Sequence, residues 1–287
     1  MNNKKTLKDC ISEAQSKKVA IGHFNISNSD GFSAVVNASK ELNVPVIIGV
    51  SEGEREYIGV NEISAMVKSY REHTGQSVFL NADHSYSFEK VKEAIDAGFD
   101  SIIFDGTELT YEQNVSITKE CIKYSKTINP QILFEAELGF IGKSSKILDS
   151  IPDGVGNLTT VKEAQDFVNE TNIDMLAPAV GNIHGIVKTG EPALNIERIR
   201  EIKQAVNIPL VLHGASGNSD EDIRHAIESG ISIVHINTEL RIAYRAGLLK
   251  SLSEFPDEIS PYKYLKGARL AMQKVVSDKL KLFNNLN

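Results

Sequence analysis

Residues 77–87 read SVFLNADHSYS, and this stretch changes character halfway along its length. Its first residues are apolar and typical of a buried strand, but Asn81, Asp83 and His84 follow at once. Burying a carboxylate beside an imidazole costs free energy unless the two groups are paired or bind a metal ion. The stretch therefore predicts a core strand that ends in a polar site.

Seven other apolar runs in the chain resemble this one. They are rich in β-branched residues and nearly continuous, as is typical of parallel strands that are buried on both faces. The predicted strands cover residues 19–25, 45–51, 77–83, 101–105, 131–139, 175–180, 209–214 and 232–239.

Amphipathic helical patterns separate these runs. The pattern at 29–43 begins at a capping residue, Ser29 or Asp30, and that at 87–98 begins at Ser87. Eight strand-helix units in 287 residues predict an α/β fold of the TIM-barrel type, with additional N- and C-terminal helices. A doubly wound sheet is the alternative, but it usually has a glycine-rich nucleotide loop after its first strand, and none follows here. We expect one domain, 1–287, whose helical extension covers about 260–284.

Composition excludes several classes of protein. The chain has 38 acidic and 31 basic residues, which argues against a nucleic-acid or anionic-membrane surface. Cys10 and Cys121 have no C-x-x-C spacing, which is typical of a reduced intracellular protein without disulfides. The N-terminus lacks the apolar core of a signal peptide, and no run approaches the ~18 apolar residues of a membrane span. We therefore expect a cytoplasmic protein.

Polar residues gather where the predicted strands end. TIM-barrel active sites lie at the carboxyl ends of the strands, so these side chains should meet at one face. His84, His184 and His213 follow three different strands, and three imidazoles with an open fourth position are a catalytic zinc arrangement. A single histidine is more often a hydrogen-bonded pocket residue, but three at strand ends favour the metal site.

Glycines beside two of these histidines indicate a second kind of site. Gly185 and Gly214 follow His184 and His213 directly, so that backbone N–H groups can approach a ligand closely. The residues after Gly214 run into a predicted helix, and a helix N-terminus favours anions. The candidate phosphate cradle combines these amides with Ser216, Thr238 and Lys188. An ordinary βα turn is the alternative interpretation.

Several long motifs, in order, point to one family. They are GHFNISN (22–28), PVIIGVSEG (45–53), NADHS (81–85), EAIDAGFDSIIFDG (93–106), EAELG (135–139), LAPAVGNIHGIVKTGEPAL (176–194), PLVLHGASG (209–217) and INTEL (236–240). Over about residues 5–275, the chain resembles the class II, zinc-dependent fructose-bisphosphate and tagatose-bisphosphate aldolases. The resemblance implies a TIM barrel that forms homodimers or homotetramers.

The resemblance also assigns roles by position. It implies zinc bound by His84, His184 and His213, with Glu137 as an alternative ligand and Asp83 as the catalytic acid/base. Sodium or potassium is an optional accessory cation. The implied substrate contacts are Asn25, Ser51, Gly185, Lys188, Gly214, Ser216, Asn237 and Thr238, and we expect His235 to join them.

The implied activity is reversible aldol cleavage of a ketose bisphosphate, first of all fructose 1,6-bisphosphate, to dihydroxyacetone phosphate and an aldehyde phosphate. Asp83 would take the proton from the C4 hydroxyl, and zinc would stabilise the charge left after the C3–C4 bond breaks. Tagatose 1,6-bisphosphate, or another phosphorylated ketose including a monophosphate, is the alternative substrate. An inactive barrel used for binding is less well supported, because such a protein has no need of Asp83 and three zinc histidines.

Two departures from the family pattern affect these expectations. Members commonly have GG-x-E after ELG, whereas this chain has FIGKSSKILDS at 140–150, so Asp149 is the candidate proton donor, with a water molecule as the alternative. We expect the 140–160 loop to close over bound substrate. His235 stands where the family usually has asparagine, and we expect it to face the metal pocket and to alter sugar preference.

Overall fold

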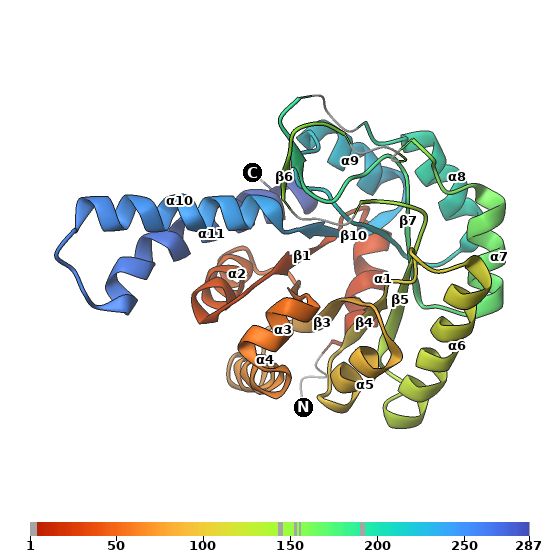
Figure 1. Ribbon diagram of the computed structural model, residues 1–287, viewed down its shortest axis with the longest axis horizontal. Helices are drawn as coiled ribbons and strands as arrows, with labels where there is room; N and C mark the ends of the chain where they lie inside the picture. Colours follow the sequence, from red (N-terminus) through yellow and green to blue (C-terminus); the bar gives the residue numbers. More distant parts are fainter. Residues whose placement is uncertain (1–4, 143–145, 152–153, 155, 190–192, 287) are drawn as a thin grey trace.

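Eight parallel strands close into a barrel in the computed structural model, which describes residues 5–142, 146–151, 154, 156–189 and 193–286 (Figure 1). Around the barrel the order is β1-β10-β9-β7-β5-β4-β3-β2. The barrel strands are β1 (Ile21–Asn25), β2 (Val46–Val50), β3 (Val78–Ser85), β4 (Ser101–Phe104), β5 (Leu133–Leu138), β7 (Met175–Pro178), β9 (Leu210–Leu212) and β10 (Ile231–Ile236). This architecture confirms the predicted TIM barrel and all eight predicted strands.

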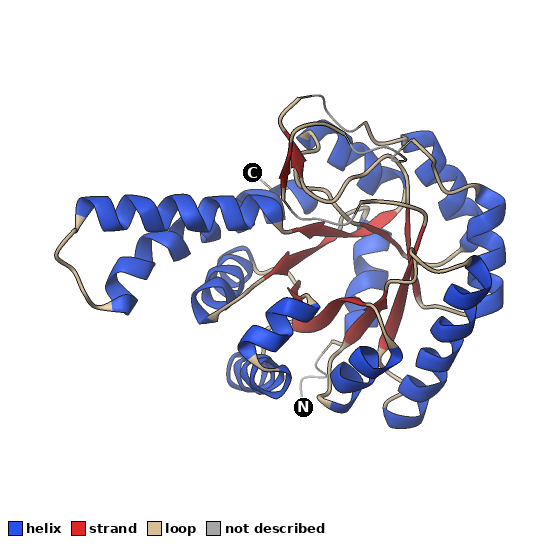
Figure 2. Ribbon diagram, in the orientation of Figure 1, coloured by secondary structure: helices blue, strands red, loops and turns tan. Residues whose placement is uncertain are grey.

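Helices surround the strands (Figure 2). They are α1 (Leu7–Lys17), α2 (Ser29–Leu42), α3 (Glu52–Ile58), α4 (Val60–Thr74), α5 (Phe88–Asp96), α6 (Tyr111–Ile128), α7 (Val161–Thr171), α8 (Ile196–Val206), α9 (Asp220–Ser229), α10 (Thr238–Glu254) and α11 (Pro261–Phe283). Ser87 caps α5 as predicted. The predicted cap of α2 at Ser29 or Asp30 is wrong, because Asn28 Oδ1 accepts the Gly31 N–H at 2.8 Å. An asparagine one position earlier satisfies the same free amide.

The interior of the barrel changes from apolar to polar along the strands. Its floor is an apolar cluster that includes Ile21, Ile47, Phe79, Leu133, Met175, Val211 and Ile233. Helix α1 packs Leu7, Cys10, Ile11 and Ala14 against this floor. Side chains on one face of a strand recur every second residue, and two positions further along five strands stand His23, Asn81, Glu135, His213 and His235. The active face therefore rests on a closed apolar base.

Helices α10 and α11 run side by side and project away from the barrel (Figure 1). We call the two helices, together with the turn at 255–260 that joins them, the arm. The two helices approach closely where glycines face each other, because a Cβ atom on Gly247 would lie 2.6 Å from the Gly267 carbonyl oxygen. The arm exposes large apolar side chains: Ile242, Leu249, Leu252, Phe255, Ile259, Tyr262 and Leu270. No described helix has the length and apolar character required to cross a membrane.

A second, small sheet was not expected from the sequence. Strands β6 (Ile147–Leu148) and β8 (Ile186–Val187) pair in parallel. Strand β6 lies within the predicted loop at 140–160, and β8 follows the predicted strand at 175–180. Residues 143–145, 152–153 and 155 lie outside the described residues, so the predicted closure of the 140–160 loop falls partly outside them.

Candidate active site

Asp83 and His84 both face the same cavity, although neighbouring residues on a regular strand point to opposite faces. The backbone explains this, because His84 has a φ of +43° and the register between β3 and β4 shifts between Ala82 and Ser85. A left-handed conformation costs a residue with a Cβ atom roughly 1–2 kcal/mol. The buried Arg55 guanidinium contacts this segment, donating to the Asp83 carbonyl oxygen at 3.2 Å and to Ser85 Oγ at 3.1 Å.

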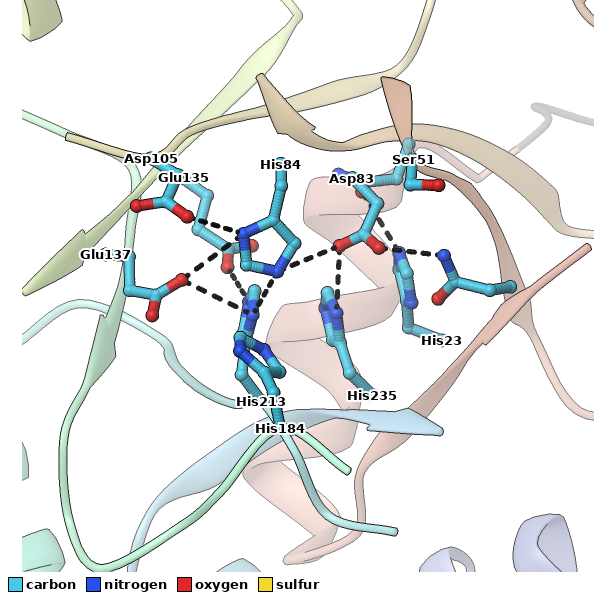
Figure 3. Close-up of polar contacts among 12 residues, drawn as sticks. His23, Ser51, Asp83, His84, Asp105, Glu135, Glu137, His184, His213 and His235 are labelled. Atoms are coloured by element: carbon cyan, nitrogen blue, oxygen red, sulfur yellow. Dashed lines mark hydrogen bonds and ion pairs between the residues drawn. The ribbon is translucent and has the colours of Figure 1, made fainter. Parts of the chain in front are cut away.

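Three histidines, His84, His184 and His213, converge beside Asp83 (Figure 3). Each has one ring nitrogen held by an oxygen atom. The holding contacts are His84 Nδ1 with Asp105 Oδ2 at 2.9 Å, His184 Nδ1 with the Gly142 carbonyl at 2.7 Å, and His213 Nε2 with Glu135 Oε1 at 2.7 Å. Such partners fix the tautomer and orientation of metal-binding imidazoles. The opposite nitrogens are left for an ion, and His84 Nε2 lies only 3.2 Å from His213 Nδ1.

Glu137 completes a set of four metal-binding side chains. Its Oε2 atom is buried without a hydrogen-bond partner and lies 3.5 Å from His84 Nδ1 and 3.8 Å from His213 Nδ1. Ligand atoms of His84, Glu137, His184 and His213 all lie within 4.8 Å of one another. An unpaired buried carboxylate oxygen is costly, and a cation bound by the opposite nitrogens of the three histidines and by this oxygen would remove that cost. The donor set therefore fits a divalent metal ion.

The Asp83 carboxylate is held on one side and open on the other. Asn25 Nδ2 donates to Oδ2 at 2.8 Å. Oδ1 is buried without a hydrogen-bond partner, 3.6 Å from His235 Nδ1 and 3.7 Å from His84 Nε2. Burial opposes ionisation, but the neighbouring histidines, His84 first, hold the pKa of Asp83 well below its usual range. Asp83 is therefore an ionised carboxylate with one oxygen able to accept a proton.

The protonation of the histidines suits metal binding, with one exception. Burial lowers the pKa of His184 to about 4 and the pKa of His213 well below its usual range, so both rings are neutral near pH 7. Burial also raises the pKa of Glu135, which leaves the Glu135–His213 pair uncharged. His84 differs: burial lowers its pKa, but the charges of Asp83 and Asp105 outweigh burial and raise it to about 10. A metal ion must displace this proton.

His235 lies inside a stack of three imidazoles. Its ring is 3.5 Å from that of His23, with 4° between the planes, and 4.1 Å from that of His213. Gly49 makes room for His23, because a Cβ atom there would lie 2.1 Å from the His23 ring. His235 lines the cavity as expected from its strand face, while its role in sugar preference stays a prediction.

The cavity has a volume of about 490 Å³, and most of the sequence-predicted site residues line it. They are Asn25, Ser51, Asp83, His84, His184, Gly185, His213, Gly214, Ser216, His235, Asn237 and Thr238. Ser216 follows β9 and contacts the start of α10, where its Oγ accepts the Asn237 N–H at 3.4 Å. Glu137 lies in the metal cluster instead.

Two predicted residues lie elsewhere. Lys188 and Asp149 form a 2.7 Å ion pair beside the small β6–β8 sheet, with exposed side chains. Neither is among the described residues that line the cavity. The phosphate contact of Lys188 and the proton transfer by Asp149 stay predictions.

Sequence reasoning missed Asp105 and Glu54 as site residues and assigned no role to Glu135. Asp105 directly follows β4, so the strand-end rule that identified Asp83 could have found it. Glu135 stands two residues before Glu137, on the same face of β5. Glu54 belongs to α3, where it accepts the Ser51 N–H in a capping box whose S-x-x-E spacing is visible in the sequence, and from there it accepts Asn25 Nδ2 at 2.9 Å.

Comparisons with known proteins agree with this geometry. The family model for class II fructose-bisphosphate aldolase matches residues 5–287. The fructose-bisphosphate aldolase of Staphylococcus epidermidis is 38% identical over 285 residues, which cover 98% of each chain. That of Geobacillus stearothermophilus is 37% identical over 283 residues, covering 98% of this chain and 96% of its own.

A solved structure is also similar. The crystal structure of the YdjI aldolase from Escherichia coli K12 superimposes with a TM-score of 0.81 at 33% sequence identity, covering 95% of this chain and 94% of that one. The barrel, the histidine cluster beside Asp83 and the family match over nearly the whole length lead to one assignment. The chain belongs to the class II fructose-bisphosphate aldolase family and is a carbon–carbon lyase.

Proposed function

We propose that this aldolase reversibly cleaves a phosphorylated ketose to dihydroxyacetone phosphate and an aldehyde, using one zinc ion per chain. One observation supports it most. Three imidazoles, each with one ring nitrogen held by an oxygen atom, converge beside the ionised Asp83 carboxylate, whose Oδ1 atom has no hydrogen-bond partner. Fructose 1,6-bisphosphate is the first substrate to test, since the named relatives are fructose-bisphosphate aldolases. Tagatose 1,6-bisphosphate and other phosphorylated ketoses are the alternatives.

Zinc is the metal that the ligand atoms favour. Imidazole nitrogens with one carboxylate suit Zn²⁺, whereas Mg²⁺ and Ca²⁺ prefer all-oxygen sites. His84, His184 and His213 would hold the ion, with Glu137 as the alternative ligand. Bound zinc supplies a Lewis acid that stabilises negative charge developing on the ketose oxygens. An accessory sodium or potassium ion is a further prediction.

The protein groups divide the remaining work. Asp83 Oδ1 takes the proton of the C4 hydroxyl, while Asn25 holds the other carboxylate oxygen in place. As the C3–C4 bond breaks, the aldehyde forms at C4, and the electron pair of the broken bond stays on C3. Gly214, Ser216 and Thr238 line the cavity beside the N-terminus of α10 and suit the phosphate next to C1, because a helix N-terminus favours anions.

Replacing Asp83 by alanine tests the mechanism. Zinc content should stay near one ion per chain, because Asp83 is outside the ligand set, but cleavage should fall ~10²–10⁴-fold. Dihydroxyacetone phosphate release from fructose and tagatose bisphosphates would be measured in the zinc-loaded wild type, in Asp83→Ala and in Asp149→Ala. Near wild-type turnover of Asp83→Ala would remove Asp83 from the mechanism, and an unaffected Asp149→Ala would remove Asp149 as proton donor.

The exposed arm supports a homodimer or homotetramer. Phe255 and Ile259 are 61% and 87% exposed, and apolar side chains gathered on a projecting element mark protein–protein contacts. The free, buried Cys10 and Cys121 suit a reducing compartment, which supports a cytoplasmic location. The acidic net charge gives no support to a nucleic-acid or membrane partner.

A further inference from the structure

A chain of hydrogen bonds leads from Asp83 to a second acid, Glu54. Asn25 Nδ2 lies 2.8 Å from Asp83 Oδ2 and 2.9 Å from Glu54 Oε2, and all three side chains are buried. Carboxylate oxygens accept hydrogen bonds, and an amide nitrogen has two hydrogen atoms to donate, so each acid receives one N–H. The Asn25 amide is therefore fixed from two sides.

Glu54 is itself held at both carboxylate oxygens. It is the third residue of α3, where its Oε2 accepts the Ser51 N–H at 2.8 Å and closes a capping box. Its Oε1 accepts Arg241 Nη2 at 2.7 Å and Ser27 Oγ at 3.4 Å. A side chain locked in this way can keep a functional group in its productive geometry. Glu54 is therefore a fixed anchor for the Asn25 amide.

The contact with Asn25 decides how the Asp83 carboxylate faces. With Oδ2 bound to Asn25, Oδ1 has no hydrogen-bond partner and lies 3.6 Å from His235 Nδ1 and 3.7 Å from His84 Nε2 (Figure 3). A general base must lie within hydrogen-bond reach of the proton that it takes, and a displacement of about 1 Å can cost ~10²-fold in rate. Loss of the anchor would leave a buried N–H of Asn25 unpaired and would free both side chains to shift.

From these contacts we infer that Glu54 is a positioning residue for the catalytic base: through Asn25, it keeps Asp83 Oδ1 turned towards the substrate. The inference rests on the proposed aldol cleavage, in which Asp83 takes the proton of the C4 hydroxyl. Glu54 is outside the metal cluster and is not among the described residues that line the cavity. Helix α3 thus holds Asp83 at two points, since Arg55, the next residue, donates to its carbonyl oxygen at 3.2 Å.

Glu54→Ala removes the anchor and keeps the residues that line the cavity. In the zinc-loaded full chain, kcat for dihydroxyacetone phosphate release should fall about 10–100-fold, with a smaller change in KM. Zinc content should stay near one ion per chain, because Glu54 is outside the ligand set. The substrate is the phosphorylated ketose that the wild type cleaves best.

Glu163→Ala is the matched control and should keep the wild-type kcat. Glu163 accepts the Thr160 N–H at 2.8 Å in the same capping arrangement on α7, and it is not among the described lining residues. Equal kcat in the two variants of an active enzyme would overturn the role of Glu54 and leave the aldolase proposal standing. Release of no dihydroxyacetone phosphate by the wild type from any phosphorylated ketose would overturn both.

A double-mutant cycle separates positioning from a general structural effect. Adding Glu54→Ala to Asp83→Ala should lower kcat by no more than about twofold, because no carboxylate is left to position. The residual rate of Asp83→Ala is taken as the part that chelation of zinc removes. No loss in the Asp83 background, or an equal loss in both backgrounds, would overturn the inference.

If Glu54→Ala does not fold, Glu54→Gln replaces it in the same cycle, with the same deciding outcomes. Glutamine can complete the capping box, but it has one acceptor oxygen where glutamate has two, so it cannot serve both Asn25 and Arg241.

Discussion

At His84 a single unusual backbone conformation allows two adjacent side chains to serve one site. With an ordinary strand conformation, Asp83 and His84 would face opposite sides of β3, and either the base or a metal ligand would be lost. Arg55, buried below, donates to the Asp83 carbonyl and to Ser85 and so supports the strained segment. Strain at the site is thus compensated by a group that lies outside the metal cluster and outside the described cavity lining.

The contact between Asp105 and His84 leads to a prediction about metal affinity. Asp105→Asn removes the carboxylate that orients His84 Nδ1 at 2.9 Å, and zinc affinity should fall about 10–100-fold. Competition with a chromogenic chelator measures the dissociation constant. Asp96→Asn, which changes a carboxylate paired with Lys92 on α5, should leave affinity unchanged. An Asp105→Asn protein with wild-type affinity would show that the contact is not needed for binding.

Protonation of His84 predicts how zinc binding depends on pH. The pKa of His84 is about 10 without metal, so the metal-free ring is protonated at pH 6–8 and zinc must displace that proton. Apparent affinity should therefore rise with pH, by up to about tenfold per unit. Asp83→Asn removes the main charge that raises this pKa, so its affinity should level off at lower pH. Affinity independent of pH from 6 to 8 would contradict the assigned protonation.

Most individual site residues could be predicted from the sequence, because the carboxyl ends of the strands in a barrel meet at one face. That rule placed Asp83, His84 and Ser51 on the cavity wall. Contacts between side chains of different elements, such as Glu54 with Asn25, could not be predicted, since no periodicity encodes them.

Among the elements, α1 has the clearest structural task, because it closes the apolar floor of the barrel. Ile11 is 2% exposed and packs in the cluster that contains Val211 and Ile233. Ile11→Ala should lower the free energy of unfolding by about 2–5 kcal/mol. Urea unfolding followed by circular dichroism measures this, with exposed Ser12→Ala as the control. A loss below ~1 kcal/mol would mean that α1 is not part of the cooperative core.

Strands could be predicted from the sequence where the apolar pattern was long, and they were missed where it was short. The predicted runs of the eight barrel strands have three or more apolar residues each in the sequence, enough to distinguish them from turns. The two-residue strands β6 and β8 have no such pattern, because they exist only through their pairing with each other. The cap of α2 was missed by one residue, since Asn28, Ser29 and Asp30 are all good capping residues.

For the whole molecule, the projecting arm predicts self-association. The double variant Phe255→Asp, Ile259→Asp puts two charges into its exposed apolar surface and should reduce the assembly to monomers. Light scattering after size-exclusion chromatography measures the mass. Ile128→Asp, on the exposed side of α6 at 52% exposure, is the control and should keep the wild-type mass. An unchanged mass in the arm variant would place the interface elsewhere.

The floor of the barrel also has a consequence for protein synthesis. Helix α1 and strand β1 leave the ribosome well before β10, with which they pack and pair although it lies about 200 residues later. At translation rates of ~5–20 residues per second, β1 waits about 10–40 s for this partner. During that interval one edge of β1 is unpaired, and unpaired edges invite association with other chains. Slow translation of the last third of the gene would therefore lower the yield of native enzyme without altering any residue.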